Sequence, residues 1–178
     1  RLGNEAGIAT TLNNIGEIQR KQGRYGEAMR LYEESLAINR RLGNQAGVAA
    51  TLNNIGLIHE SQGRYGEAMR LYEESLAIKR RLGNEAGIAT TLNNIGSIHD
   101  YQGRYGEAMR LYEESLAINR RLGNQAVIAV TLDNMAYIAF KRGKYGEVLQ
   151  MLCQALAIQR RIGVPTKNAE KGIAVLKR

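Results

Sequence analysis

Apolar and polar residues follow a pattern that returns every 40 residues along this chain. The segment 62–78 recurs letter for letter at 22–38 and 102–118, and a looser copy occupies 142–158. A fixed period of this size is typical of stacked supersecondary units, each of which buries its apolar face only against its neighbours.

Each repeat contains two amphipathic segments. In the second repeat, apolar residues recur at helical spacing over about 45–62 and again over about 65–82, which predicts two helices separated by Gly63. Each repeat is therefore predicted to be a hairpin of a first helix, called helix A, and a second, called helix B. An Asn follows a Gly before each helix A and is expected to open it: Asn4, Asn44, Asn84 and Asn124.

The repeats divide the chain into four tandem hairpins over 1–163, at about 1–40, 41–80, 81–120 and 121–163. Residues 164–178 are predicted to form a C-terminal capping helix. The chain opens inside a repeat, so we expect a fragment of a longer array. Small residues stand where the helices should cross, and the fourth repeat replaces three of them, so its packing should differ: Gly56, Ala68 and Ser75 become Ala136, Val148 and Ala155.

Composition and charge narrow the function classes. The net charge is +8, and seven of these charges lie after Arg120, so a basic stripe for nucleic acid does not run along the array. No apolar run is long enough for a membrane span, and we expect no membrane partner. The single cysteine, Cys153, fits a reducing compartment, and a cytoplasmic location is expected.

The order of small and aromatic residues resembles the tetratricopeptide repeat: Leu52-x2-Ile55-Gly56, then Gly63-x-Tyr65, Ala68-x3-Tyr72 and Ser75. The pattern departs from the family at Leu52, His59 and Arg80. The 40-residue period resembles the long-repeat members found in kinesin light chains, GoLoco-binding polarity adaptors and prokaryotic signalling proteins. This resemblance implies an all-α, right-handed solenoid that serves as a non-catalytic binding platform.

The copies differ most at the end of helix A, whereas helix B is nearly invariant in the first three repeats. In the arrays that this chain resembles, helix A lines the concave wall. We therefore expect a groove tuned by variable side chains, with neutral drift on a solvated surface as the alternative. These side chains are Glu17, Arg20, Lys21, Leu57, Glu60, Ser61, Ser97, Asp100, Tyr101, Tyr137, Phe140 and Lys141.

Paired amides form the constant part of the same wall. Asn has a modest to poor helix propensity, so its recurrence in the middle of each helix A indicates a structural or binding role. An amide both donates and accepts, which suits the backbone of an extended peptide, and by resemblance the second Asn of each pair matches a peptide-contacting residue. A structural bridge between helices is the alternative. The pairs are Asn13-Asn14, Asn53-Asn54, Asn93-Asn94 and Asp133-Asn134.

The charges of this wall favour a protein or peptide partner with a basic centre, because the central repeats carry acids and the ends carry Lys or Arg. The Lys and Arg residues by which some family members hold a chaperone C-terminus are absent. Three aromatic residues, Tyr101, Tyr137 and Phe140, are expected either to form a pocket or, for the last two, to pack beneath the final helix.

No catalytic, metal-binding or cofactor-binding constellation is found. His59 and His99 lack a metal-ligand partner at the usual spacing, and Cys153 lacks a His and acid pair. The sequence thus predicts a scaffold that binds an extended peptide or helix, as a monomer or with weak end-to-end association. Two alternatives stay open: a structural module that stacks end to end, and nucleic-acid binding through the basic C-terminal end.

Overall fold

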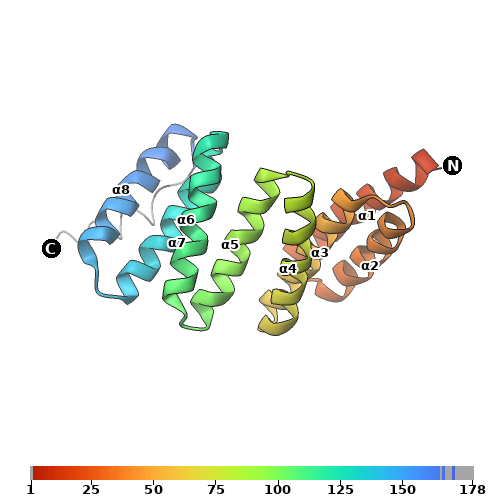
Figure 1. The fold of residues 1–178 in the computed structure, drawn as a ribbon, viewed down its shortest axis with the longest axis horizontal. Helices are drawn as coiled ribbons and strands as arrows, with labels where there is room; N and C mark the ends of the chain where they lie inside the picture. The colour runs from red at the N-terminus through yellow and green to blue at the C-terminus, as the bar shows by residue number, and fades with distance from the viewer. Residues whose placement is uncertain (1, 165, 167–169, 171–178) are drawn as a thin grey trace. The chain divides into compact units, whose positions relative to one another are not determined.

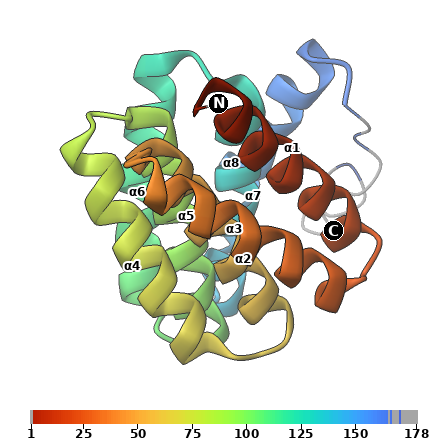
Figure 2. The same cartoon turned by 90° about the vertical axis from the view of Figure 1, so that its right-hand side faces the viewer.

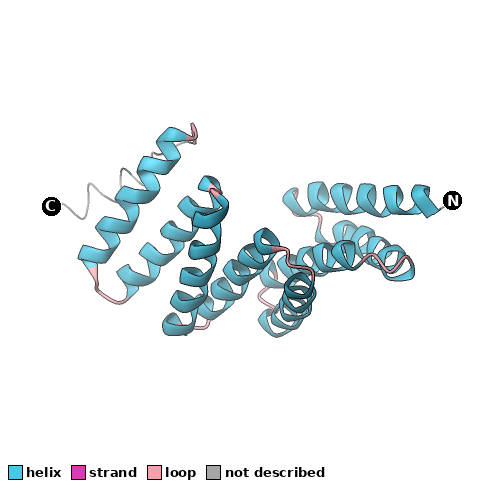
Figure 3. Cartoon of the chain, turned by 45° about the horizontal axis from the view of Figure 1, so that its top comes forward, coloured by secondary structure: helices cyan, strands magenta, loops and turns pink. Residues whose placement is uncertain are grey.

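The computed structural model describes residues 2–164, 166 and 170, and these form helices joined by short loops, without strands (Figure 3). Every helix of the repeats lies where the hydrophobic period predicts it, to within a few residues. The helices are α1 Leu2–Lys21, α2 Tyr25–Arg41, α3 Gln45–Ser61, α4 Tyr65–Arg81, α5 Glu85–Tyr101, α6 Tyr105–Leu122, α7 Gln125–Lys141 and α8 Tyr145–Arg161. The predicted capping helix at 164–178 falls largely outside the described residues.

Contacts divide the chain into two compact units, Arg1–Gly87 and Ile88–Arg178. Figures 1 and 2 show the helices of both units. Unit 1 holds the first two hairpins, α1 with α2 and α3 with α4. Unit 2 begins within α5 and holds the hairpins α5 with α6 and α7 with α8.

The loops between paired helices are tight because one glycine in each adopts a left-handed conformation. Gly63, for example, has φ +71°, which any residue with a Cβ atom tolerates poorly. The amide of Arg64 then bonds the carbonyl of His59 at 2.9 Å, so the chain reverses within three residues.

The expected Asn caps are present in two of the four places. Asn44 Oδ1 accepts from the amide of Gly47 at 3.1 Å, and Asn84 Oδ1 accepts from Gly87 at 2.9 Å. Asn124 also opens its helix, at the N-cap of α7, but makes no side-chain cap bond. The prediction is wrong for Asn4, which lies inside α1. The fourth repeat has Val127 at the position of Gly47, where a Cβ atom would meet the capping Asn side chain at 2.7 Å.

A tyrosine ring set against a glycine holds each of the first two hairpins together. Tyr72 of α4 is fully buried, and a Cβ atom added to Gly56 of α3 would lie 2.5 Å from its ring. Tyr32 covers Gly16 in the same way. The glycine is therefore required by the close approach of the ring.

The fourth hairpin packs differently at the position of this glycine–tyrosine contact, as its substitutions predict. Leu152 replaces the tyrosine, and Ala136 replaces the glycine. Ala136, Ala139 and Val148 form one small buried cluster with Leu152 packed against it. The alanine fits because the smaller leucine stands opposite it.

Successive hairpins within a unit join through apolar clusters. In unit 1, Ile55 and Ile58 of α3 pack against Ala28 and Tyr32 of α2. In unit 2, Met135 and Ile138 of α7 occupy the equivalent places against α6. One face of helix A thus packs on its own helix B, and an adjacent face packs on the preceding helix B.

Candidate functional site

The amide pairs lie at the seams between successive A helices. In unit 1, Asn54 Nδ2 of α3 donates to Asn13 Oδ1 of α1 at 3.2 Å, and Thr51 Oγ1 donates to the same oxygen at 3.4 Å. In unit 2, Asn93 of α5 bonds Thr131 of α7 at 2.9 Å. Asn13, Asn54 and Asn93 therefore have the bridging role that the sequence left open as an alternative.

The second residue of each pair is at least partly exposed. In α1 and α3 it is more exposed than the first, since Asn14 is exposed beside a partly exposed Asn13, and Asn54 is partly exposed beside a buried Asn53. In α5 and α7 both members of the pair are partly exposed. We call the surface formed in each unit by these amides and the variable residues the helix A wall.

The helix A wall of unit 1 carries a charge cluster on α1. The Glu17 carboxylate accepts two bonds from the Arg20 guanidinium, at 2.9 and 2.8 Å, and Lys21 Nζ lies 3.3 Å away. The hydrogen bond from Arg20 lowers the pKa of Glu17 below its usual value. Both cations and the acid are thereby held in one place.

Two carboxylates of this wall also anchor the buried tyrosines, a role that the sequence analysis missed. Tyr32 OH donates to Glu17 at 3.2 Å, and Tyr72 OH donates to Glu60 at 2.6 Å. Burial is the main cause that raises the pKa of both phenols, so they stay protonated donors. The acid sits one residue after the glycine in α1 but four after it in α3, so a comparison of equivalent positions hides the shared function.

A hollow of about 150 Å³ opens beside Asn13, where α1 and α3 meet. Thr10 and Ala50 line it, together with the buried amide of Asn39. Asn39 belongs to a polar network in which Asn44 Nδ2 donates to Asn39 Oδ1 at 2.7 Å. The hollow is large enough for one side chain or a few water molecules.

The remaining wall positions of unit 1 lie in the second half of α3 and become more exposed toward the end of the helix. Leu57 and Glu60 are partly exposed, and Ser61 is exposed at the end of α3, where its hydroxyl donates to the Leu57 carbonyl at 2.8 Å. The wall of unit 1 is therefore mainly polar.

The helix A wall of unit 2 is aromatic. Tyr101, Tyr137 and Phe140 are each at least 50% exposed, and Tyr145 from α8 joins them with its ring centroid 5.9 Å from that of Phe140, edge to face. Exposed aromatic side chains are the usual anchors of protein interfaces. Tyr145 occupies a constant position of helix B, so a comparison of the repeats does not single it out.

Charges flank these rings. Lys141 Nζ lies 5.1 Å from the centroid of the Tyr137 ring and is close enough to Asp100 to lower the pKa of that carboxyl. Burial outweighs this effect, so the pKa of Asp100 is raised overall. Ser97 and Asn134 complete the wall as partly exposed polar groups.

Asp133 is the least satisfied acid of unit 2. Its Oδ2 accepts from Gln159 Nε2 at 2.9 Å, but its Oδ1 is buried without a hydrogen-bond partner. Burial raises the pKa of Asp133 above its usual value. The folded state thus disfavours the ionised carboxylate.

Replacing Asp133 with asparagine is therefore expected to raise the free energy of unfolding by about 1 kcal/mol at neutral pH. A raised pKa means that the charge costs stability above the folded-state value and costs nothing below the ordinary Asp value near 4. The gain of Asp133→Asn over the parent should shrink as pH falls toward about 3. Urea unfolding at both pH values measures it, and an equal gain at both would contradict the burial of charge.

His59 is partly exposed, its Nδ1 lacks a hydrogen-bond partner, and burial lowers its pKa. Among the described residues, no cluster of His, Cys, Asp or Glu can hold a metal ion. Nor does any helix in that part of the chain have the length and hydropathy that a membrane span needs.

Comparison with known proteins shows the family. The family model described as "Tetratricopeptide repeat" matches residues 7–81 and 87–161. A search of curated protein sequences found no match.

Solved structures share the fold at low sequence identity. BtubC (BKLC) from P. vanneervenii is 20% identical with a TM-score of 0.84, covering 97% of this chain and 72% of that one. A putative kinesin light chain from Podosopora anserina, with nearly identical TPR-like repeats, is 18% identical with a TM-score of 0.75, covering 97% and 86%. Aspartyl phosphate phosphatase F from Bacillus subtilis is 13% identical with a TM-score of 0.83, covering 89% of this chain and 42% of that one.

These likenesses confirm the all-α solenoid class predicted from the 40-residue period. The family as a whole mediates contacts between proteins and is generally non-catalytic. With the model matching both pairs of hairpins, the chain belongs to the tetratricopeptide repeat family.

Proposed function

We propose that this chain is a non-catalytic interaction scaffold whose helix A walls bind an extended peptide or helix of a partner protein. The observation that carries the proposal is the distribution of differences among the repeats. Helix B is almost invariant over the first three repeats, while the wall positions change from charged in α1 to aromatic in α7. Binding that differs from repeat to repeat explains this contrast.

The second amide of each pair is the constant element of the proposed site. Asn14, Asn54, Asn94 and Asn134 recur at the same place on each helix A, and each is at least partly exposed. An amide there can donate to one backbone carbonyl of a bound peptide and accept from one backbone amide. These residues would hold the main chain while their neighbours select side chains.

The wall of unit 2 favours a particular ligand chemistry. Tyr101, Tyr137 and Phe140 offer exposed ring faces, and Asp100 and Asp133 lie on the same pair of helices. Burial disfavours both carboxylates in their charged form, so a cation that reaches them regains that cost. We therefore expect the ligand of this wall to carry a Lys or Arg beside an apolar or aromatic residue.

The test is a selection of a random peptide library on the chain and on the double variant Asn54→Ala, Asn94→Ala. We expect peptides enriched on the parent to lose about tenfold in affinity for the variant, the equivalent of about one good hydrogen bond. A matched control changes one exposed residue of helix B in each unit, Glu73→Ala with Glu113→Ala, and should leave the affinity unchanged.

The outcomes of the selection distinguish the ligand chemistry, the position of the binding site and the presence of peptide binding. Enrichment of basic and aromatic residues supports the ligand chemistry of unit 2. Peptides that bind the parent and the Asn54→Ala, Asn94→Ala variant equally would place the binding site away from the amides. The absence of any enriched peptide would contradict peptide binding by these walls. Circular dichroism of both variants keeps a loss of binding distinct from a loss of folding.

A further inference from the structure

One face of α1 is apolar and exposed, although its copies in other helices are buried. Ile8, Ile15 and Ile18 are 43%, 40% and 54% exposed. Their counterparts in α3, by the 40-residue period, are Val48, Ile55 and Ile58, and none of these exceeds 6%. In α7 the equivalent Ile128, Met135 and Ile138 are likewise buried.

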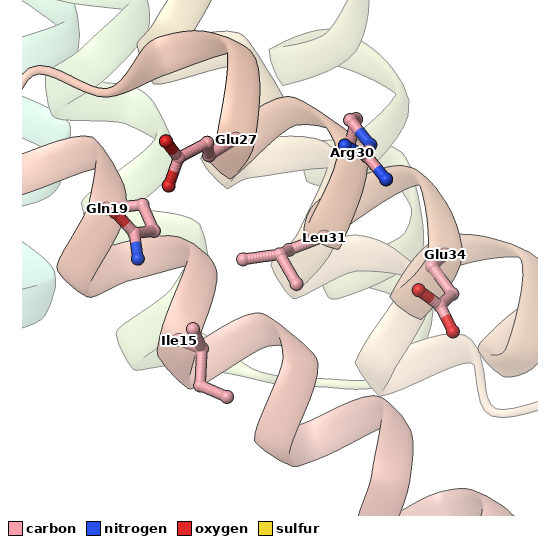
Figure 4. Close-up of a pocket in the computed structure, with 6 residues that line it drawn as sticks. All are labelled: Ile15, Gln19, Glu27, Arg30, Leu31 and Glu34. Atoms are coloured by element: carbon pink, nitrogen blue, oxygen red, sulfur yellow. The ribbon is translucent and has the colours of Figure 1, made fainter.

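The same face continues across α2 into a hollow of about 530 Å³ (Figure 4). Ile15 and Gln19 of α1 and Glu27, Arg30, Leu31 and Glu34 of α2 line it. In the second hairpin, the counterparts of Ile15 and Leu31 are Ile55 and Leu71, and both pack in the cluster that α2 provides. The hollow is thus the place that a preceding helix B fills in the neighbouring copy.

The molecule itself therefore shows what fits this surface. In unit 1 the occupant is α2, which lays Tyr32 and Leu36 against α3 and joins Arg40 to Glu74 of α4 at 3.5 Å. Glu34, on the rim of the hollow, is the counterpart of Glu74. The matching ligand is a helix with an apolar ridge and an Arg near its C-terminal end.

Among the described B helices, α8 is the one that no later described helix follows. It keeps the required ridge, with Leu149, Leu152 and Leu156 at the positions of Met29, Tyr32 and Leu36. Arg160 stands at the position of Arg40. Tyr145, at the start of this ridge, is 57% exposed, while its counterparts Tyr25 and Tyr105 are partly buried against apolar clusters.

We propose that α8 of one copy of this chain docks on the α1 face of a second copy, head to tail, as α2 docks on α3 within unit 1. The Leu149–Leu156 ridge would cover Ile15 and Ile18, and Arg160 would pair with Glu34. Such a contact joins two different surfaces, so it leaves one of each unused in every assembly and permits further addition. Its central contact, between Ile15 and Ile18 and the leucines of α8, lies outside the helix A walls and does not depend on peptide binding, although Tyr145 borders both surfaces.

The association should be weak, because the monomer already satisfies one of the groups involved. Arg160 pairs with Glu170 at 2.8 Å, and docking must exchange this ion pair for the one with Glu34. Removing the competitor by Glu170→Gln should therefore strengthen association, by about twofold to fivefold for an exposed ion pair.

Sedimentation equilibrium of the full chain over a wide concentration range tests the proposal. We expect the average mass to rise with concentration, and Ile15→Glu to lower the association constant by about tenfold or more, since it places a charge in the apolar contact. Because Ile15 is already 40% exposed in the monomer, this variant should keep its fold, which circular dichroism checks.

Mixing variants tests the head-to-tail geometry. Leu156→Glu, changed at the other end, should also block self-association, yet a mixture with Ile15→Glu should form pairs and nothing larger, since each variant keeps one intact face. If Leu156→Glu fails to fold, the exposed pair supplies the test: Arg160→Glu should weaken association and adding Glu34→Arg should restore it. A parent chain of constant mass, or association unaffected by both α8 variants, would overturn the proposal.

Discussion

Replacing Gly56 with alanine is expected to lower the free energy of unfolding by about 2 kcal/mol, even though alanine favours helices. The added Cβ atom would lie 2.5 Å from Cε1 of Tyr72, whose ring is fully buried and cannot move away without disturbing its bond to Glu60. Overpacking of this kind costs more than the propensity of alanine returns. Urea unfolding of the variant and the parent gives the difference.

The control for this prediction lies in the same hairpin. Gly66 is also helical, but a Cβ atom there meets nothing within 4 Å. Gly66→Ala should therefore leave stability unchanged or raise it by up to about 1 kcal/mol. A loss as large as that of Gly56→Ala would show that the ring contact is not the cause.

The fourth hairpin indicates which second substitution should reduce the cost of Gly56→Ala. It carries Ala136 with Leu152 where the second carries Gly56 with Tyr72. Tyr72→Leu alone should cost about 2–3 kcal/mol through the lost hydrogen bond and the cavity. In combination with Gly56→Ala the costs should fall short of their sum by about 1–2 kcal/mol, because leucine leaves room for the methyl group. Additive costs would contradict this account of the fourth repeat.

Replacing Lys79 with asparagine is expected to raise the free energy of unfolding by about 2–3 kcal/mol at neutral pH. Lys79 is only 7% exposed, and burial lowers its pKa to about 8 from 10.5. The folded state therefore resists the charged ammonium. The equivalent Asn39 instead donates to the Ser35 carbonyl at 3.0 Å and accepts from Asn44 at 2.7 Å, which gives asparagine a ready set of partners.

The sign of the pH dependence follows from the lowered pKa. The cost of the buried charge is complete below pH 8 and is released as the pH rises toward 10.5, where the unfolded chain also loses its proton. The advantage of Lys79→Asn over the parent should therefore shrink across this range. The reverse change, Asn39→Lys, should destabilise at neutral pH. Urea unfolding of both variants at several pH values tests this, and a pH-independent gain would contradict it.

The sequence predicted the helices well because the repeat supplies several copies of one pattern. The boundaries of α3 and α4 fall within one residue of those expected from the apolar period and its glycines. Asn4 was misplaced because the pattern assumes a helix ending before it, whereas α1 runs through it from Leu2. Repetition thus predicts an element well where its neighbours repeat as well.

The wall was predicted less completely, since the chemistry of a position depends on what lies across from it. Glu17 and Glu60 occupy different positions of their helices, and only the structure shows that both accept from a buried tyrosine. Lys79 reads as a conservative polar variant of Asn39 in the sequence, and its burial became evident only with the packing around it. Tyr145 was missed because a constant helix B residue offers no contrast between copies.

The most direct test of peptide binding by the helix A walls is photo-crosslinking. A peptide enriched on the chain would carry a photoreactive residue at its centre, and mass spectrometry would identify the residues to which it attaches. We predict attachment to α1, α3, α5 or α7 at wall residues such as Asn54, Asn94 and Tyr137. Attachment confined to residues of α2, α4, α6 or α8 other than Tyr145 would contradict the proposed function.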